Sequence, residues 1–265
     1  MSELENIKIV LVGAGNVATH IGLTLKAKGI SIVQVYSRTR ASAASLAARL
    51  GCPSTDRLTD LCTDADLYII SVKDNALDEV IRGLSHCRAD ALYVHTAGSV
   101  PMAVFDGRMS HYGVFYPMQT FSKEKEVDFS KVPCFIEASD DASLTLLNQF
   151  ATSLSSHVMV LSSEKRRYLH LAAVFACNFA NHCYAVAASL LSEQGIPFDV
   201  MLPLVDEAAE KVHHLAPQTA QTGPAVRGDT KVMDAQMRLL DAHPEWQKIY
   251  GLMSKDIQCG EKDKE

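Results

Sequence analysis

The sequence feature that most constrains the fold is a glycine-rich segment, GAGNVA, at residues 13–18. It follows the apolar run 7–12, and apolar residues at helical spacing continue from it to Gly29. In the pattern GxGxx(G/A), the first glycine makes a tight turn, the second lets the backbone approach a pyrophosphate, and the small third residue lets the helix pack on the strand. The segment predicts dinucleotide binding, with a purely structural turn as the alternative. The expected cofactor contacts are Gly13, Gly15, Asn16 and Val17.

Strands and helices continue to alternate as far as residue 160. The apolar runs have few polar interruptions, which is typical of strands buried inside a parallel sheet. We therefore predict an α/β fold of the Rossmann type, with a doubly wound, mostly parallel sheet. The expected strands are 32–36, 66–72, 91–95, 114–116, 134–138 and 157–160, and the expected helices are 41–50, 77–84 and 142–154.

The β signal ends near residue 161, and the rest of the chain has helical spacing. The expected helices are 164–193, 198–214, 230–241 and 244–254. We therefore predict two domains, a nucleotide-binding domain at 1–160 and a smaller all-α domain for substrate binding or dimerisation at 161–265. The segment 169–191 is long enough to cross a bilayer, but five polar residues interrupt it, so a buried helix of a soluble protein is the preferred interpretation.

Composition excludes several classes of protein. With 25 Lys and Arg against 31 Asp and Glu, the formal net charge is −6, which argues against a nucleic-acid-binding surface. The seven cysteines are scattered without a CxxC pair or a Cys/His cluster, so neither a disulfide framework nor a metal site is expected. The N-terminus lacks the features of a signal peptide. These observations predict a cytoplasmic protein with reduced thiols and no metal.

The choice of cofactor depends on the residues that follow the second strand. An NAD enzyme places an Asp or Glu there, whereas this chain has Ser37-Arg38-Thr39-Arg40. A hydroxyl and a guanidinium suit the 2′-phosphate of NADP, so Ser37 and Arg38 are expected cofactor contacts; solvated loop charges are the alternative. A methyltransferase would also require the missing acidic residue. No tyrosine has a lysine four positions later, which excludes the short-chain dehydrogenase chemistry.

Taken with these features, four later segments resemble a known family. They are HTAGS at 95–99, YPMQTF at 116–121, HLAAVFACN at 170–178 and TGPAVRGD at 222–229. The whole chain resembles a bacterial family of Rossmann-like NADP oxidoreductases with a C-terminal domain of unknown function. That family is related to 6-phosphogluconate dehydrogenase, pyrroline-5-carboxylate reductase and the deazaflavin-dependent NADP oxidoreductases. The segment 170–178 lacks the lysine of the β-hydroxyacid dehydrogenases, which argues against a hydroxyacid substrate.

The resemblance implies a dinucleotide domain followed by an all-α domain that dimerises, with the substrate held in the cleft between them. Ligands of open α/β sheets bind outside the carboxyl ends of the strands. The resemblance makes His95 a neighbour of the nicotinamide, with a core histidine as the alternative. It also implies cofactor contacts at the ends of the predicted strands 66–72 and 91–95. These are Val72, Lys73, Asn75, Thr96 and Ala97.

The long helix carries polar residues at a spacing of three or four. His170, Asn178 and Asn181 share one stripe of an ideal α-helix, so they either satisfy one another in a dimer core or face the cofactor. We predict His170 as a general acid and Asn178 as an orienting amide, with His95 as the other candidate acid. Arg227, in the loop before Asp229, is expected to bind a substrate carboxylate, unless this loop only connects two helices.

The sequence thus predicts an NADP-dependent oxidoreductase that transfers a hydride between NADP(H) and a small imine or carbonyl compound. Gln119 and Thr120 are expected to position the substrate, and the protein is expected to act as a homodimer without nucleic-acid or membrane partners. Two other hypotheses stay open. One is a sensor or scaffold that binds NADP without catalysis, and the other is hydride exchange between NADP and a deazaflavin.

Overall fold

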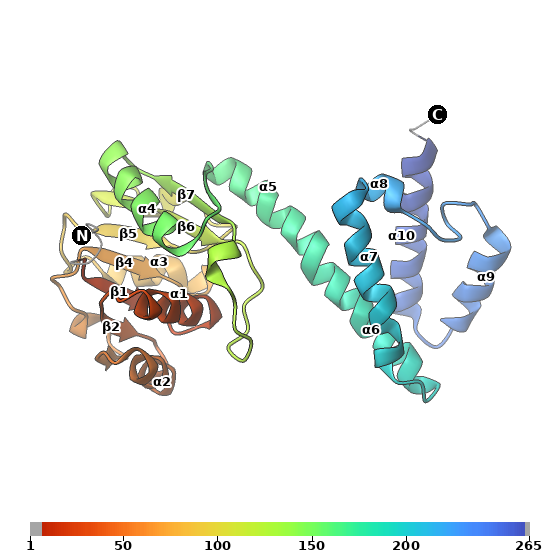
Figure 1. Ribbon diagram of the computed structural model, residues 1–265, viewed down its shortest axis with the longest axis horizontal. Coiled ribbons are helices and arrows are strands. Elements are labelled where there is room, and N and C mark those ends of the chain that lie inside the picture. Colours follow the sequence, from red (N-terminus) through yellow and green to blue (C-terminus); the bar gives the residue numbers. More distant parts are fainter. Residues whose placement is uncertain (1–6, 263–265) are drawn as a thin grey trace. The chain divides into compact units, whose positions relative to one another are not determined.

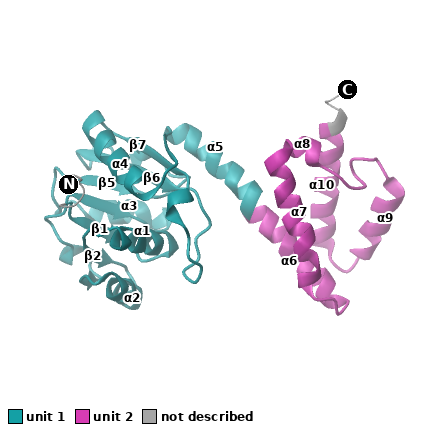
Figure 2. Ribbon diagram, viewed as in Figure 1, with its two compact units in different colours: residues 1–177 teal, residues 178–265 magenta. Residues whose placement is uncertain are grey.

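A computed structural model describes residues 7–262 of the chain. The chain divides into two compact units, residues 1–177 and 178–265 (Figure 2). The first unit contains the sheet, and the second is formed by helices. The division falls within a long helix, whereas the predicted boundary at 160/161 marks a change of secondary structure. That boundary stays a prediction.

Over its described residues, from residue 7 onward, the sheet unit is built on eight strands in the order β3-β2-β1-β4-β5-β6-β7-β8 (Figure 1). Every pair is parallel except β6 and β7, which are antiparallel, with Phe115 opposite Ile136. The predicted α/β class with a mostly parallel sheet is therefore confirmed. The strands are β1 Ile9–Val12, β2 Ile32–Tyr36, β3 Ser54–Thr55, β4 Leu67–Ile70, β5 Leu92–His95, β6 His111–Pro117, β7 Cys134–Ala138 and β8 Val158–Val160.

Helices cover both faces of this sheet. Side chains alternate along β1, so Ile9 and Leu11 join one buried cluster with α1, α2 and α4, while Val10 and Val12 join another with α3. The chain leaves β1 for β2 on one side and crosses to β4 on the other, which creates a switch point at the carboxyl ends of β1 and β4. The helices are α1 Asn16–Ala27, α2 Arg40–Leu50, α3 Asp74–Gly83 and α4 Asp141–Leu154.

A long helical segment follows the sheet. It begins with α5 Ser163–Ala173, continues as a π-helical turn at Val174–Phe179 and ends with α6 Ala180–Glu193. By length and composition, helix 163–193 is able to cross a membrane, but one such helix is weak evidence of a span because core helices of soluble proteins pass the same test. The π-helical turn has no signature in the apolar spacing, and it changes the register that the predicted polar stripe assumes.

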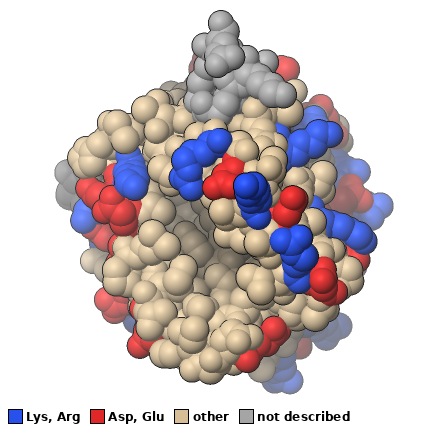
Figure 3. Space-filling view, turned by 90° about the vertical axis from the view of Figure 1, so that its right-hand side faces the viewer, with Lys and Arg blue, Asp and Glu red and all other residues tan. Residues whose placement is uncertain are grey.

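Up to residue 262, the second unit contains α6, a short 3-10 helix at Phe198–Met201 and four further α-helices. These are α7 Leu202–His214, α8 Pro217–Ala220, α9 Thr230–Leu239 and α10 Pro244–Lys262. Few of its side chains are buried, and large apolar residues such as Leu204, Leu239 and Leu252 are 61–80% exposed. Figure 3 looks onto this unit and shows broad areas of uncharged residues on the face toward the viewer. Large apolar side chains that are exposed in this way are typical of a protein interface.

Candidate functional site

A cavity of about 390 Å³ lies at the carboxyl ends of β1, β2 and β4, at the switch point of the sheet. Its volume is within the range of small-molecule and cofactor sites. The predicted cofactor residues Gly13, Gly15, Asn16, Ser37, Arg38, Val72 and Lys73 all line it. The other predicted contacts, Val17, Asn75, Thr96 and Ala97, lie outside the cavity lining.

The two glycines of the turn have different physical reasons to be glycine. Gly13 has a φ of 133°, and a Cβ atom there would lie 2.2 Å from the carbonyl oxygen of Ser71. Gly15 has open space where its Cβ would be, on the side of the cavity. Ala18, on the first turn of α1, is fully buried in the core. The turn therefore leaves room for a ligand beside Gly15, as the sequence pattern requires.

The N-terminus of α1 is open to a ligand. Gly15 is its N-cap and offers no side chain to the N–H groups of the first turn. The Asn16 side chain points elsewhere, because its Nδ2 donates to the carbonyl oxygen of Phe121 at 2.6 Å. Unsatisfied N–H groups and the helix dipole favour an anion at this position. A pyrophosphate group fits these donors.

Basic side chains surround the same cavity. Arg38 and Ser37 follow β2 at the start of α2, whose N-cap, Thr39, makes no side-chain capping bond. Lys73 lies at the N-cap of α3, and Lys123 reaches the cavity from the loop between β6 and β7. Among the described residues that line the cavity, Glu79 is the one carboxylate. Three cations against one anion favour a ligand with several phosphate groups.

His95 lies at the end of β5 and is fully buried. Its Nδ1 accepts a hydrogen bond from the N–H of Ala97 at 3.2 Å, and its ring stacks on Phe105. Burial, with a smaller contribution from the charge of Arg166, lowers the pKa of His95 to about 3. The imidazole is therefore neutral at pH 7 and holds the turn that follows β5. Its predicted role as an acid stays a prediction.

His170 lies on α5 and is half-buried. Its Nδ1 is 3.0 Å from the hydroxyl oxygen of Tyr116, at the end of β6, and the two rings meet edge to face. Gly98 packs against both rings, since a Cβ atom there would lie 2.5 Å from Nδ1 of His170. Among residues 7–262, Nε2 of His170 has no hydrogen-bond partner. This nitrogen is available to a ligand.

A buried ion pair attaches α5 to the sheet beside this histidine. The guanidinium of Arg166 is fully buried and donates to Glu137 at 2.7 Å, to the carbonyl oxygen of Val100 at 2.6 Å and to Ser163 at 3.1 Å. Burial raises the pKa of Tyr116, and the nearby charge of Arg166 opposes this effect. Tyr116 therefore keeps its proton at neutral pH and can serve His170 as donor or acceptor.

The remaining predicted residues lie in two places. Gln119 and Thr120 are exposed in the loop after β6, where the side chain of Gln119 accepts from the N–H of Thr120 at 2.8 Å. Asn178 and Arg227 belong to the helical unit, and both are exposed. Asp229 caps α9 by accepting from the N–H of Val232 at 3.2 Å. The loop that contains Arg227 therefore has a structural role, because its residue Asp229 caps the first turn of α9.

Known families and solved structures match nearly the whole chain. Residues 8–98 match the family described as NADP oxidoreductase, coenzyme F420-dependent, and residues 132–257 match a domain of unknown function, DUF2520. BF3122 from Bacteroides fragilis, whose crystal structure is described as that of a candidate NADP oxidoreductase, is 52% identical. The match covers 97% of this chain and 99% of that chain, with a TM-score of 0.93. The chain belongs to this NADP oxidoreductase family.

More distant solved structures share the fold of this NADP oxidoreductase. An imine reductase from Myxococcus stipitatus in complex with NADP⁺ is 18% identical, with a TM-score of 0.69 over 97% of this chain and 94% of its own. A reductive aminase from Aspergillus terreus in complex with NADPH is 16% identical, with a TM-score of 0.71 over 96% and 95%. Among curated proteins, no sequence matches significantly.

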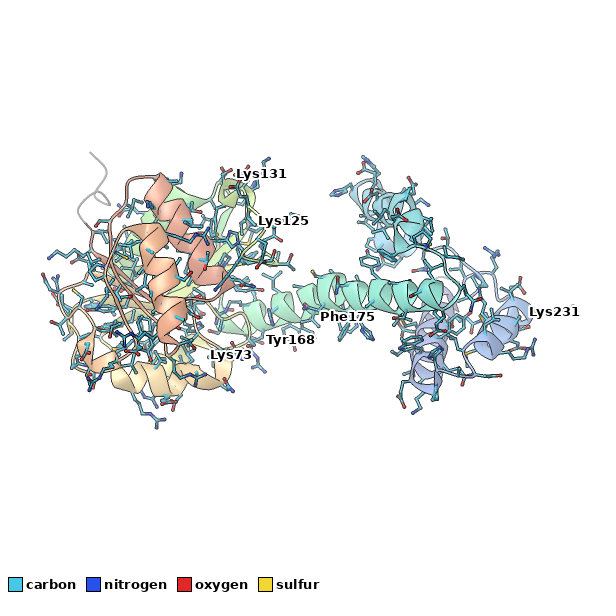
Figure 4. The ribbon with its side chains drawn as sticks, turned by 90° about the horizontal axis from the view of Figure 1, so that it is seen from below. Lys73, Lys125, Lys131, Tyr168, Phe175 and Lys231 are labelled. Carbon is cyan, nitrogen blue, oxygen red and sulfur yellow. The ribbon has the colours of Figure 1, made fainter. Side chains whose placement is uncertain are left out.

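Sequence reasoning did not find three residues of this oxidoreductase that stand beside the predicted ones. Tyr116 begins the family segment YPMQTF and Arg166 lies in a charged segment, but only the packing of α5 on the sheet reveals their contacts. Lys123 lies in a charged loop far from the glycine segment in sequence. Figure 4 shows Lys73 on the side of the sheet unit from which α5 extends, and it shows Tyr168 and Phe175 along the helix. Within the described residues, no cluster of metal-ligating side chains occurs.

Proposed function

We propose that this protein binds NADPH in the cavity beside the glycine turn and reduces a small imine or carbonyl compound. The open backbone at Gly15 and the uncapped start of α1 suit the pyrophosphate. Ser37 and Arg38, between β2 and α2, suit the 2′-phosphate. One observation supports the proposal most strongly. Arg38 lines the cavity after β2, at the position where an NAD enzyme has an acidic side chain.

The reaction requires a hydride and a proton at different atoms. When bound, NADPH supplies the hydride to the carbon of the C=N or C=O bond and becomes NADP⁺. The nitrogen or oxygen of that bond then takes one proton, which gives an amine or an alcohol. The proton donor must therefore lie close to the substrate, apart from the basic side chains that we assign to the phosphates.

His170 is the residue that we assign as this acid. In the imidazolium form both ring nitrogens carry a proton, so Nδ1–H donates to the Tyr116 hydroxyl oxygen. The proton on Nε2, the nitrogen without a partner in the described chain, is then the one that the substrate receives, which leaves the neutral ring. Gly98 leaves the space that both rings need. His95 instead orients the backbone after β5, since it is buried and neutral. Thr96, Ala97, Val17 and Asn75 are assigned to the surroundings of the cofactor.

Substrate orientation is assigned to polar groups in loops and on the long helix. Gln119 and Thr120 follow β6, which carries Tyr116 and ends at Pro117, so their amide and hydroxyl groups lie close in sequence to the partner of His170. Asn178 lies in the π-helical turn, a feature that often occurs at functional sites. Arg227 is assigned to an anionic end of the substrate.

A second function is favoured by one observation. The match to the F420-dependent family over residues 8–98 supports hydride exchange between NADP and a deazaflavin. That match covers the cofactor half of the chain and ends before Tyr116 and His170, so it carries less weight for the second reactant. A protein that binds NADP without catalysis is the remaining alternative.

The experiment that tests the proposal is titration of the purified protein with NADPH and NADH, followed by turnover with imines, ketones and a deazaflavin. Arg38→Ala is expected to weaken NADPH binding about tenfold, because it removes one charge-assisted contact, and to change NADH binding little. Arg40→Ala is the matched control, since Arg40 is exposed two residues later and lies outside the cavity lining.

Turnover then separates the functions. His170→Ala is expected to abolish NADPH oxidation with an imine while NADPH still binds. Oxidation only with the deazaflavin would support the second function, and binding without any oxidation would support the sensor. Failure of the wild-type protein to bind either nucleotide would overturn the cofactor assignment.

We also propose that the protein acts as a cytoplasmic homodimer. All seven cysteines are free thiols, as in proteins of a reducing compartment. Leu171 on α5 and Leu204 on α7 are 52% and 61% exposed, and a second copy of the chain is the occupant that we assign to these apolar surfaces.

A further inference from the structure

We infer that Lys123, on the loop between β6 and β7, binds the pyrophosphate of the dinucleotide. The inference rests on the cofactor site proposed above and adds a residue outside the glycine turn and the β2 end. Lys123 lines the cofactor cavity together with Gly13, Gly15 and Asn16, although it is more than a hundred residues away in sequence.

The loop is attached to α1 immediately before Lys123. Asn16 donates from Nδ2 to the carbonyl oxygen of Phe121 at 2.6 Å. His20, one helical turn later, bonds through Nε2 to the carbonyl oxygen of Ser122 at 2.8 Å. The His20 ring also lies 5.1 Å from the ring of Phe121. Two consecutive carbonyl groups are therefore held on α1, and the next residue of the loop is Lys123.

These attachments determine which phosphate Lys123 can reach. Asn16 is the first residue of α1, whose N-terminus offers its N–H groups to the pyrophosphate. Arg38 follows β2, at the part of the cavity assigned to the 2′-phosphate. The attachment to α1 thus places Lys123 on the pyrophosphate side. Since NADPH and NADH share the pyrophosphate, Lys123 is expected to contribute affinity without selecting between them.

The same loop carries Gln119 and Thr120, which we assign to the substrate. A bond from Lys123 to the cofactor would restrain the loop at a third point, beyond the two carbonyl groups held by Asn16 and His20. Cofactor binding would then help to order the substrate-orienting residues before the substrate arrives. The loop then has a role in both halves of the reaction, whereas the sequence alone connects it only with the substrate.

The test uses Lys123→Gln and, as the matched control, Lys125→Gln. Lys125 lies on the same loop but outside the lining of the cofactor cavity. NADPH and NADH are titrated into the wild type, both variants and Arg38→Ala at low and high salt. Lys123→Gln is expected to weaken both nucleotides by the same factor, about three- to tenfold, because an exposed cation makes a modest, screened contact. Lys123→Arg is expected to restore most of the affinity.

Each result distinguishes the inference from the cofactor proposal. Equal affinities for Lys123→Gln and Lys125→Gln, with a large effect of Arg38→Ala, would overturn the inference and leave the cofactor site intact. Loss of NADPH binding alone in Lys123→Gln would overturn the assignment to the pyrophosphate and place Lys123 at the 2′-phosphate. Absence of binding to the wild type would overturn both proposals.

Discussion

At the scale of the residue, His95 and His170 show how burial separates two histidines that look equivalent in sequence. Each follows apolar residues and each stands in a segment typical of the family. His95 is fully buried and neutral, whereas His170 is half-buried with one nitrogen bonded to Tyr116. Burial makes a charged ring at His95 costly, whereas Nε2 of His170 has no partner in the described chain and can meet a ligand.

The environment of His95 makes stability depend on pH. Its native pKa is about 3, because burial penalises the charged ring, whereas the ordinary value is 6.5. Between these values the unfolded chain binds a proton that the native chain does not. Stability is therefore complete above pH 6.5 and is lost as the pH falls, by up to about 1.4 kcal/mol per pH unit. Urea unfolding between pH 4 and 7 measures this slope.

His95→Gln removes the titrating group, so its unfolding free energy is expected to change less with pH in this range. His157→Gln, in which an exposed histidine is replaced, serves as the control and should keep the wild-type slope. Hydrogen bonds from Ser143 lower the pKa of Asp140 below its ordinary value of 3.8. Asp140 therefore affects stability mainly below pH 4, outside the pH range of this measurement. An unchanged slope in His95→Gln would show that His95 is not the group responsible.

Residues fixed by local rules were predictable, and those fixed by tertiary contacts were not. Gly13 and Arg38 follow from the chemistry of a turn and of a phosphate, and the cavity contains both. Tyr116 and Lys123 act through partners more than fifty residues away. A single sequence gives no signal for such pairs, because neither their residue types nor their spacing is unusual.

At the scale of the element, one buried cation, Arg166, contributes strongly to the attachment of α5 to the sheet. Arg166→Met would leave the Glu137 carboxylate, 17% exposed, without its cation. Removing one partner of a buried ion pair typically costs about 3–5 kcal/mol, so a loss of this size is expected in the unfolding free energy. Denaturant unfolding of the purified variant measures it.

The neighbouring exposed arginine provides the control for this prediction. Arg167→Met is expected to change stability by less than about 0.5 kcal/mol. The double variant Arg166→Met with Glu137→Leu should recover part of the loss, because no charge then stays buried and unpaired. A small effect of Arg166→Met alone would mean that water or relaxation satisfies Glu137, contrary to the proposed anchoring role.

The elements themselves follow the apolar periodicity closely where they are long. The predicted strands 32–36 and 134–138 match β2 and β7, and the helix at 142–154 matches α4 within one residue. The two-residue strand β3 is too short for any periodic pattern. The π-helical turn at Val174–Phe179 differs from α-helix only in its hydrogen bonding, which apolar spacing does not encode.

At the scale of the whole molecule, the apolar surface of the helices needs a covering partner. Tyr168, Leu171 and Leu204 are 71%, 52% and 61% exposed, in an all-helical region with few buried side chains. A second copy would remove such surface from water at roughly 25 cal/mol per Å² before the entropic cost of association. The charged start of helix 163–193, with Arg166 bonded to the sheet, fits this occupant better than a bilayer.

Sedimentation equilibrium of the wild-type protein at micromolar concentration is therefore expected to give twice the 28.9 kDa mass of the chain. Leu171→Glu combined with Leu204→Glu should shift it toward the monomer, because each carboxylate would have to be desolvated in the interface. Asn148→Glu on the exposed face of α4 is the control and should leave the dimer intact. A wild-type monomer would contradict the prediction, and co-flotation with lipid vesicles would assign the apolar helix to a membrane instead.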